Sequence, residues 1–158
     1  MDQQNLFETP VTYRLVRLEY LTALAVCIVL LIYHWGDVRW LAFVSLFAYI
    51  DVIGYLPGAV AHRRAYGRRV HPGFYVLYNV AHSAITALLV ALAWAWWVRP
   101  EWALLAIPIH LCGDRALFGN FLKPFGVSFE PSAHPDFVHF RSSYVNACSR
   151  KPGDSHGT

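Results

Sequence analysis

The sequence predicts an all-α integral membrane protein built as a bundle of four transmembrane helices. Of its 158 residues, 56% are hydrophobic and only 15% are charged. The apolar residues lie in four long blocks, each close to the roughly 20 residues that a tilted helix needs to cross the hydrocarbon core. Because lipid offers the backbone no hydrogen-bond partners, we expect these blocks to be helices.

The four blocks define a transmembrane domain over residues 17–118, preceded by an N-terminal cytoplasmic flank, 1–16. The expected spans are residues 17–36, 39–57, 73–98 and 101–118. The fourth is short and contains Pro108, which lacks a backbone donor and therefore predicts a kink.

The chain after the fourth span is different in character. Residues 119–141 are rich in phenylalanine but too often interrupted by Gly and Pro to cross a membrane. We expect this segment to lie along the inner membrane surface or to fold back under the bundle. Residues 142–158 predict a disordered tail.

Basic residues predict the orientation in the cell (plasma or inner) membrane. One side carries most of them: Arg14, Arg17, Arg63, Arg64, Arg68, Arg69, Arg115, Lys123, Arg141, Arg150 and Lys151. The opposite side carries only Arg39 and Arg99. Because basic residues concentrate on the cytoplasmic side of a membrane, both termini should be cytoplasmic.

Tryptophan supports the same orientation. The six tryptophans fall at the two expected outer turns: Trp35, Trp40, Trp94, Trp96, Trp97 and Trp102. Indole rings prefer the headgroup region, so these residues predict an outer aromatic belt. The arginine-rich loop resembles a nucleic-acid patch in composition, but arginines contacting anionic lipid explain it more simply. We therefore expect membrane lipid, and no nucleic acid, as a partner.

Polar residues in three of the spans fall at one depth. Counted from the inner ends of their spans, Asp51 lies about six residues in, Asn79 and His82 about six to nine, Asp114 about four and His110 about eight. At about 1.5 Å of rise per residue, all five lie roughly 6–14 Å below the cytoplasmic surface.

Within each span, the polar residues also share one face, because they are three or four positions apart. The stripes are Asp51 with Tyr55, Asn79 with His82 and Ser83, and His110 with Asp114. A polar side chain facing lipid costs several kcal/mol, so the stripes should turn inward and form one pocket that opens toward the cytoplasm. Lys123 and His134 are expected at its mouth as substrate-binding residues.

The chemistry of this set is restrictive. The candidate metal ligands are Asp51, His82, His110 and Asp114, a donor set that suits zinc, iron or manganese. Asn79 and Tyr55 would orient a bound water or carbonyl group. Without a metal, His82 or His110 would act as a base, with an Asp setting its tautomer. Buried His–Asp pairs also join helices structurally, so that role stays open.

Three motifs resemble a small bacterial family of four-helix integral membrane proteins of unknown function. They are Asp51-x-x-Gly54-Tyr55, Tyr78-Asn79-x-x-His82 and His110-x-x-x-Asp114-Arg115, followed by Gly119, Leu122-Lys123, Phe129 and His134. The match covers roughly residues 40–135, and its third motif adds Arg115 to the candidate catalytic residues. The chain departs from this pattern in a longer arginine-rich loop and in the proline that follows His134.

A looser likeness is to the LexA-binding inner-membrane hydrolase family. It rests on His62-Arg63, His82-Ser83 and the later His110 and Asp114. That family's Asp-x-Asp-His motif is missing, since this chain has only Asp51 there. The likeness implies metal-dependent hydrolysis.

Three functions follow as expectations. The first is a membrane enzyme acting on a lipid or another apolar molecule, by metal-dependent hydrolysis or by acid–base isomerisation or cyclisation, in which Tyr55 and Tyr78 would stabilise positive charge. The second is a haem-binding electron carrier with His82 and His110 as ligands, although two nearby carboxylates disfavour it. The third is a non-catalytic accessory subunit or small carrier whose polar cluster is structural.

Overall fold

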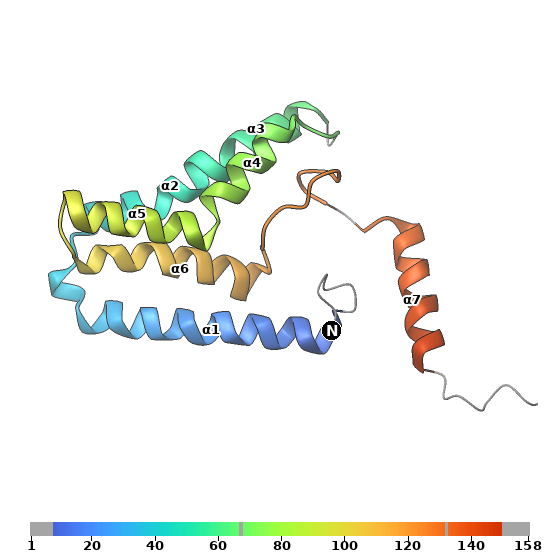
Figure 1. Ribbon diagram of the computed structural model, residues 1–158, viewed down its shortest axis with the longest axis horizontal. Coiled ribbons are helices and arrows are strands. Elements are labelled where there is room, and N and C mark those ends of the chain that lie inside the picture. Colours follow the sequence, from blue (N-terminus) through green and yellow to red (C-terminus); the bar gives the residue numbers. More distant parts are fainter. Residues whose placement is uncertain (1–7, 67, 132, 150–158) are drawn as a thin grey trace, which may run out of the picture.

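The computed structural model describes residues 8–66, 68–131 and 133–149, and every regular element in these ranges is a helix. Successive passes of the chain run in opposite directions side by side (Figure 1). The N-terminal end of α1 and the turn between α3 and α4 therefore lie at the same end of the molecule (Figure 1).

Two passes are long and apolar enough to cross a membrane. The first is helix α1 (Pro10–Tyr33), which begins earlier than the predicted residue 17 because Thr9 caps it and Pro10 suits its first turn. The second is a continuous helical run, Trp40–Arg64. It consists of α2 (Trp40–Tyr49), the π-helical turn η2 (Ile50–Tyr55) and α3 (Leu56–Arg64).

The third pass is broken. Helices α4 (Pro72–Ala81) and α5 (Ala84–Trp97) are bent by 56° at His82 and Ser83, and together they count as a third candidate span if the pair is one crossing. The Ser83 side chain accepts a hydrogen bond from the backbone N–H of Ile85, so it starts α5 as a new helix. A continuous helix over 73–98 was predicted.

The fourth pass is short and irregular. It consists of the 3₁₀ turn η3 (Trp102–Leu105), α6 (Ala106–Gly113) and the π-helical turn η4 (Asp114–Phe118). Pro108 lies in the first turn of α6, where a missing backbone donor breaks no helical hydrogen bond. In place of the predicted kink, a 3₁₀ turn precedes the helix. The described residues thus contain two or three candidate spans by length and composition, not four.

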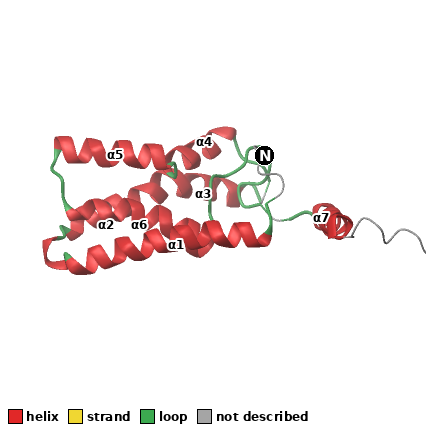
Figure 2. Ribbon diagram, turned by 60° about the horizontal axis from the view of Figure 1, so that its bottom comes forward, coloured by secondary structure: helices red, strands yellow, loops and turns green. Residues whose placement is uncertain are grey.

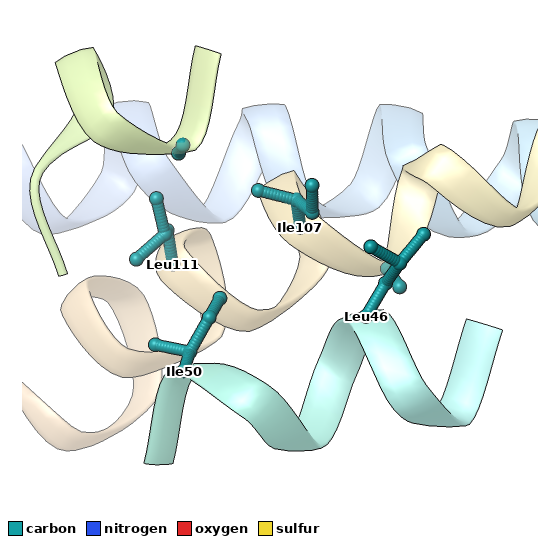
Figure 3. Close-up of a cluster of buried hydrophobic side chains, with 6 residues drawn as sticks. Leu46, Ile50, Ile107 and Leu111 are labelled. Atoms are coloured by element: carbon teal, nitrogen blue, oxygen red, sulfur yellow. The ribbon is translucent and has the colours of Figure 1, made fainter. Parts of the chain in front are cut away.

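The core is small and lies between the passes. Leu46 and Ile50 of the second pass pack against Ile107 and Leu111 of α6 (Figure 3). Many other large apolar side chains are exposed, particularly along α1 and α5. So many exposed apolar side chains are costly in water and favourable in lipid, which supports a membrane location.

Glu101, in the turn between α5 and η3, ties the two tryptophan-bearing turns together. Its carboxylate, 5% exposed, accepts hydrogen bonds from the Arg39 guanidinium and from Trp94 Nε1. The hydrogen bond from Arg39, assisted by Trp94, lowers the pKa of Glu101 to about 2 although burial opposes the shift. Nearby, His34 stacks on Trp102 with ring centroids 3.6 Å apart.

At the opposite end, residues 119–131 fold back against α3 and α4; we call them the return segment. Its Phe129 is fully buried beside Tyr75 and Tyr78, and it fills the space that Gly58 leaves on α3. Folding back under the bundle was one of the two predicted alternatives for this part of the chain.

Helix α7 (Pro135–Ser149) stands away from the other helices in both views (Figures 1 and 2). Its side chains are exposed as far as Cys148. Helix thus replaces the predicted disorder over residues 142–149, and residues 150–158 of the predicted tail lie outside the described part of the chain.

Candidate metal centre

The four candidate ligands lie at or beside irregularities in their helices. Asp51 and Asp114 belong to the π-helical turns η2 and η4, His82 is at the break between α4 and α5, and His110 lies near the end of α6. A π-helical turn shifts the direction in which side chains point and is frequent at functional sites. These local distortions aim side chains from three separate passes at one point.

The four side chains form a closed ring of nitrogen–oxygen contacts. The Nε2 atom of His82 lies 3.5 Å from Asp51 Oδ1 and 3.4 Å from Asp114 Oδ2. The Nε2 atom of His110 lies 3.6 Å and 3.5 Å from the same two oxygens. Two ligands of one tetrahedral ion, each about 2.1 Å from it, are about 3.4 Å apart. Asp51, His82 and His110 therefore lie close enough together to bind a metal ion.

The ring of His82 is fixed on its far side. Its Nδ1 atom lies 3.0 Å from the carbonyl oxygen of Tyr78. Because a carbonyl oxygen only accepts, Nδ1 is the donor, and the lone pair of Nε2 points into the ring of contacts. The imidazole also stacks on the Tyr78 ring, and it lies so close to Gly54 that an added Cβ would be 3.1 Å from its atoms.

His110 is placed differently. Its side chain is 3% exposed, and neither Nδ1 nor Nε2 has a hydrogen-bond partner among the described residues. Its ring packs against Phe47, with centroids 4.6 Å apart. Leaving a buried polar group without a hydrogen bond costs about 1–3 kcal/mol. Among the described residues, the charged neighbours of this imidazole are the two carboxylates.

The site is enclosed on the histidine side and open at Asp51. The Asp51 side chain is 52% exposed, whereas both histidines are buried. Asp51 is therefore the candidate ligand most accessible from outside the protein, and the predicted opening toward the cytoplasm stays a prediction.

Asn79 lies beside the site but faces the return segment. Its Nδ2 donates to the carbonyl oxygen of Lys123 at 2.9 Å, and its Oδ1 accepts from the backbone N–H of Lys123 at 2.7 Å. Both polar groups of this amide therefore hold the backbone of the return segment.

Lys123 and Tyr55 lie together in an aromatic cluster with Tyr78 and Phe129. The Lys123 ammonium donates to the Phe129 carbonyl oxygen at 2.6 Å and lies 4.8 Å from the centre of the Tyr78 ring. Burial lowers the pKa of Lys123, while Glu130, 3.6 Å away, opposes the shift. The Tyr55 ring packs against Phe129 and Tyr78.

The two remaining predicted residues lie outside the ring. Arg115 donates from Nη2 to the backbone carbonyl oxygen of His82 at 3.1 Å, and its guanidinium lies over the Tyr20 ring. It thus supports the break that positions His82. The side chain of His134 is 75% exposed, and its polar contacts are with Asp136 in α7, so the structure does not bring it to the site.

Sequence reasoning named Gly54 only as part of a family motif and missed Gly58. In the structure, Gly54 leaves room for His82, and Gly58 leaves room for Phe129. Two glycines four positions apart lie on one helix face, and this spacing is a usable signal for close approach of another element.

Comparison with known proteins adds no relative from which a function could be transferred. The site is therefore interpreted from its own residues and geometry, and the two resemblances noted in the sequence stay predictions. No family model, curated protein or solved structure matches this chain.

Proposed function

We propose that this protein is a multi-pass membrane enzyme, a metal-dependent hydrolase that acts on a lipid. The observation that carries the proposal is the ring in which both imidazole Nε2 atoms face the same two carboxylates. Its ligands would be Asp51, His82, His110 and Asp114. Coordination would also give a bond to Nε2 of His110, which makes no hydrogen bond among the described residues.

The donor set favours zinc, iron or manganese. Two imidazole nitrogens and two carboxylate oxygens suit borderline divalent ions. Two carboxylates also balance the charge of a divalent ion, so the complete site would carry no net charge at a depth where charge is costly. The hydrogen bond from His82 to the Tyr78 carbonyl is the outer support that metal-binding histidines usually have.

Hydrolysis is the reaction that this site supports best. A divalent ion that keeps a free coordination position beside these ligands would lower the pKa of a bound water, to about 7 for zinc, and would so supply a nucleophile near neutral pH. Among the ligands, Asp51 is the half-exposed one, so water and substrate would arrive on its side. Arg115 and the stacked Tyr78 ring hold His82 in place from behind.

We also propose that all four passes cross the inner membrane of a bacterium, with both termini in the cytoplasm. The broken third pass and the short fourth pass would complete a bundle with α1 and Trp40–Arg64. This arrangement is supported by the alternating direction of the passes and by the arginine-rich turn between α3 and α4, which lies at the same end as the start of α1 (Figure 1).

An acid–base isomerase or cyclase is the second candidate. The N···O distances of 3.4–3.6 Å also fit a protonated imidazole paired with carboxylates in the absence of a metal. The same contacts are compatible with a structural cluster in an accessory subunit. A haem carrier is less well supported, because both carboxylates contact both Nε2 atoms in the space that a porphyrin ring would need.

The test is an activity assay on detergent-purified protein with lipid carboxylic esters and phosphate esters. We expect hydrolysis that a chelator abolishes and added metal restores, that His110→Ala reduces at least about 100-fold, and that His62→Ala, outside the ring, leaves unchanged. Hydrolysis that survives both the chelator and His110→Ala would contradict the proposal.

A further inference from the structure

A groove with a volume of about 530 Å³ runs along the outside of the molecule between α5 and α6. Its walls are apolar and include Ala84, Ala87 and Leu88 of α5 and Ile107, Pro108 and Leu111 of α6. The volume lies within the roughly 300–1,000 Å³ typical of small-molecule sites. Three alanines, at 84, 87 and 91, present only methyl groups to the groove, and this leaves the space open.

The two ends of the groove differ in charge. Glu101 and Trp102 lie at one end, where the Glu101 carboxylate is neutralised by Arg39. Arg115 lies at the other end, about 20 Å away at about 1.5 Å of rise per residue. No carboxylate of the described residues lies within ion-pair distance of Arg115, which donates from Nη2 to a backbone carbonyl. An apolar groove thus ends at an uncompensated positive charge.

We propose that this groove binds the hydrocarbon chain of a phosphate-bearing lipid, with the phosphate at Arg115. A guanidinium can bond two phosphate oxygens at once, and such a charged pair gains strength in an apolar setting. The apolar walls suit one long chain, and the end at Arg115 belongs to the side expected to be cytoplasmic.

Arg115 is close to the metal centre in the chain but belongs to a separate surface. It follows Asp114 and bonds the backbone carbonyl of His82, whereas none of the four proposed metal ligands lines the groove. The inference is therefore a lipid-binding site that stands on its own geometry, beside the proposed hydrolase site.

Three probes separate the possible sources of binding: hexadecyl phosphate, hexadecanol and inorganic phosphate. We expect native mass spectrometry of the detergent-purified protein to show hexadecyl phosphate bound at least about tenfold more tightly than hexadecanol, because only the phosphate can form charged hydrogen bonds with the guanidinium. Inorganic phosphate should bind more weakly than either. Equal affinities for the phosphate and the alcohol, or inorganic phosphate binding as well as the lipid, would overturn the proposal.

A matched pair of variants locates the site. Leu88 and Leu89 are neighbours on α5, both 60% exposed, but only Leu88 lines the groove. Leu88→Trp should fill the groove and lower the affinity for hexadecyl phosphate at least about tenfold, while Leu89→Trp leaves it unchanged. Equal effects of the two substitutions would place the lipid elsewhere.

Two further variants separate the groove from the metal centre. Arg115→Gln should remove the preference for the phosphate over the alcohol while the chain still binds. His110→Ala should lose metal and keep the lipid. If His110→Ala keeps its metal and Leu88→Trp still loses lipid, the metal proposal fails and the groove stands; the reverse pattern removes the groove and leaves the metal centre.

Discussion

His82 and His110 face the same two carboxylates, yet their surroundings differ. His82 has a carbonyl partner on Nδ1 and an arginine on its own backbone carbonyl, whereas neither ring nitrogen of His110 has a hydrogen-bond partner among the described residues. The difference between the two rings lies at Nδ1, since both Nε2 atoms face the same two carboxylates at similar distances. An ion among the four side chains would give each Nε2 atom a bond and would leave the difference at Nδ1 unchanged.

The convergence of the four candidate ligands could be predicted from residue type, spacing and depth alone. Asp51, His82, His110 and Asp114 do converge in space, because each costly side chain in an apolar pass has few polar neighbours to choose from. The same reasoning could not assign Asn79, whose amide binds the backbone of a segment far along the chain. Nor could it exclude His134, because sequence alone does not show where α7 lies.

The clearest prediction at this scale concerns Gly54. A Cβ at this position would lie 2.6 Å from the Ala81 Cβ and 3.1 Å from the His82 ring. Gly54→Ala should therefore destabilise the protein by about 1–3 kcal/mol and weaken metal binding by displacing His82. Denaturant unfolding and metal titration measure both effects.

Gly113→Ala is the matched control, since nothing lies within 4 Å of the Cβ that it adds. It should retain both metal and stability. If Gly54→Ala is as stable as Gly113→Ala, the close contact between η2 and His82 is not as described.

At the scale of elements, the site depends on features that hydropathy does not detect. An average over residues 73–98 is apolar throughout, so a continuous helix was predicted where the structure bends by 56°. The local cap supplied by Ser83 is the physical reason for the break. The π-helical turns at Asp51 and Asp114 are likewise invisible in an average of hydropathy.

The return segment should depend on Asn79. Replacing it with alanine removes two hydrogen bonds to the backbone of Lys123, which should cost about 1–3 kcal/mol and release the segment. Hydrogen exchange followed by mass spectrometry should then show faster exchange over residues 121–129. Asn120→Ala, at an exposed neighbouring position, should leave exchange unchanged. Equal exchange in the Asn79 variant and the wild type would argue against this contact.

At the scale of the whole molecule, composition is enough to predict a helical fold and a membrane location. It is not enough to predict how many times the chain crosses the membrane. Two candidate spans are clear, a third depends on how the bent pair is counted, and the fourth pass is too short to qualify by length. The third and fourth passes are divided into short helices near the polar side chains, so no single helix in them is long enough to count as a span. The passes that build the site are therefore the ones that are hardest to recognise as spans.

The interaction between Arg39 and Glu101 predicts how the stability of the protein depends on pH. The hydrogen bond from Arg39 lowers the pKa of this carboxyl from 4.5 to about 2 in the folded protein. A depressed pKa contributes stability that is fully present above pH 4.5 and is lost as the pH falls toward 2. Thermal unfolding in detergent should show a smaller fall of Tm over this window in Glu101→Gln than in the wild type. Parallel curves would show that Glu101 contributes nothing to acid sensitivity.

The central claim is the metal centre, and elemental mass spectrometry of gently purified protein tests it most directly. We predict about one zinc, iron or manganese ion per chain in the wild type and in His62→Ala, lost in His110→Ala and in the double variant His110→Ala, Asp114→Ala. Size-exclusion chromatography must show that the variants remain folded. A wild-type protein that holds no stoichiometric metal and takes up none when it is added, or a folded His110→Ala variant that keeps its ion, would contradict the account.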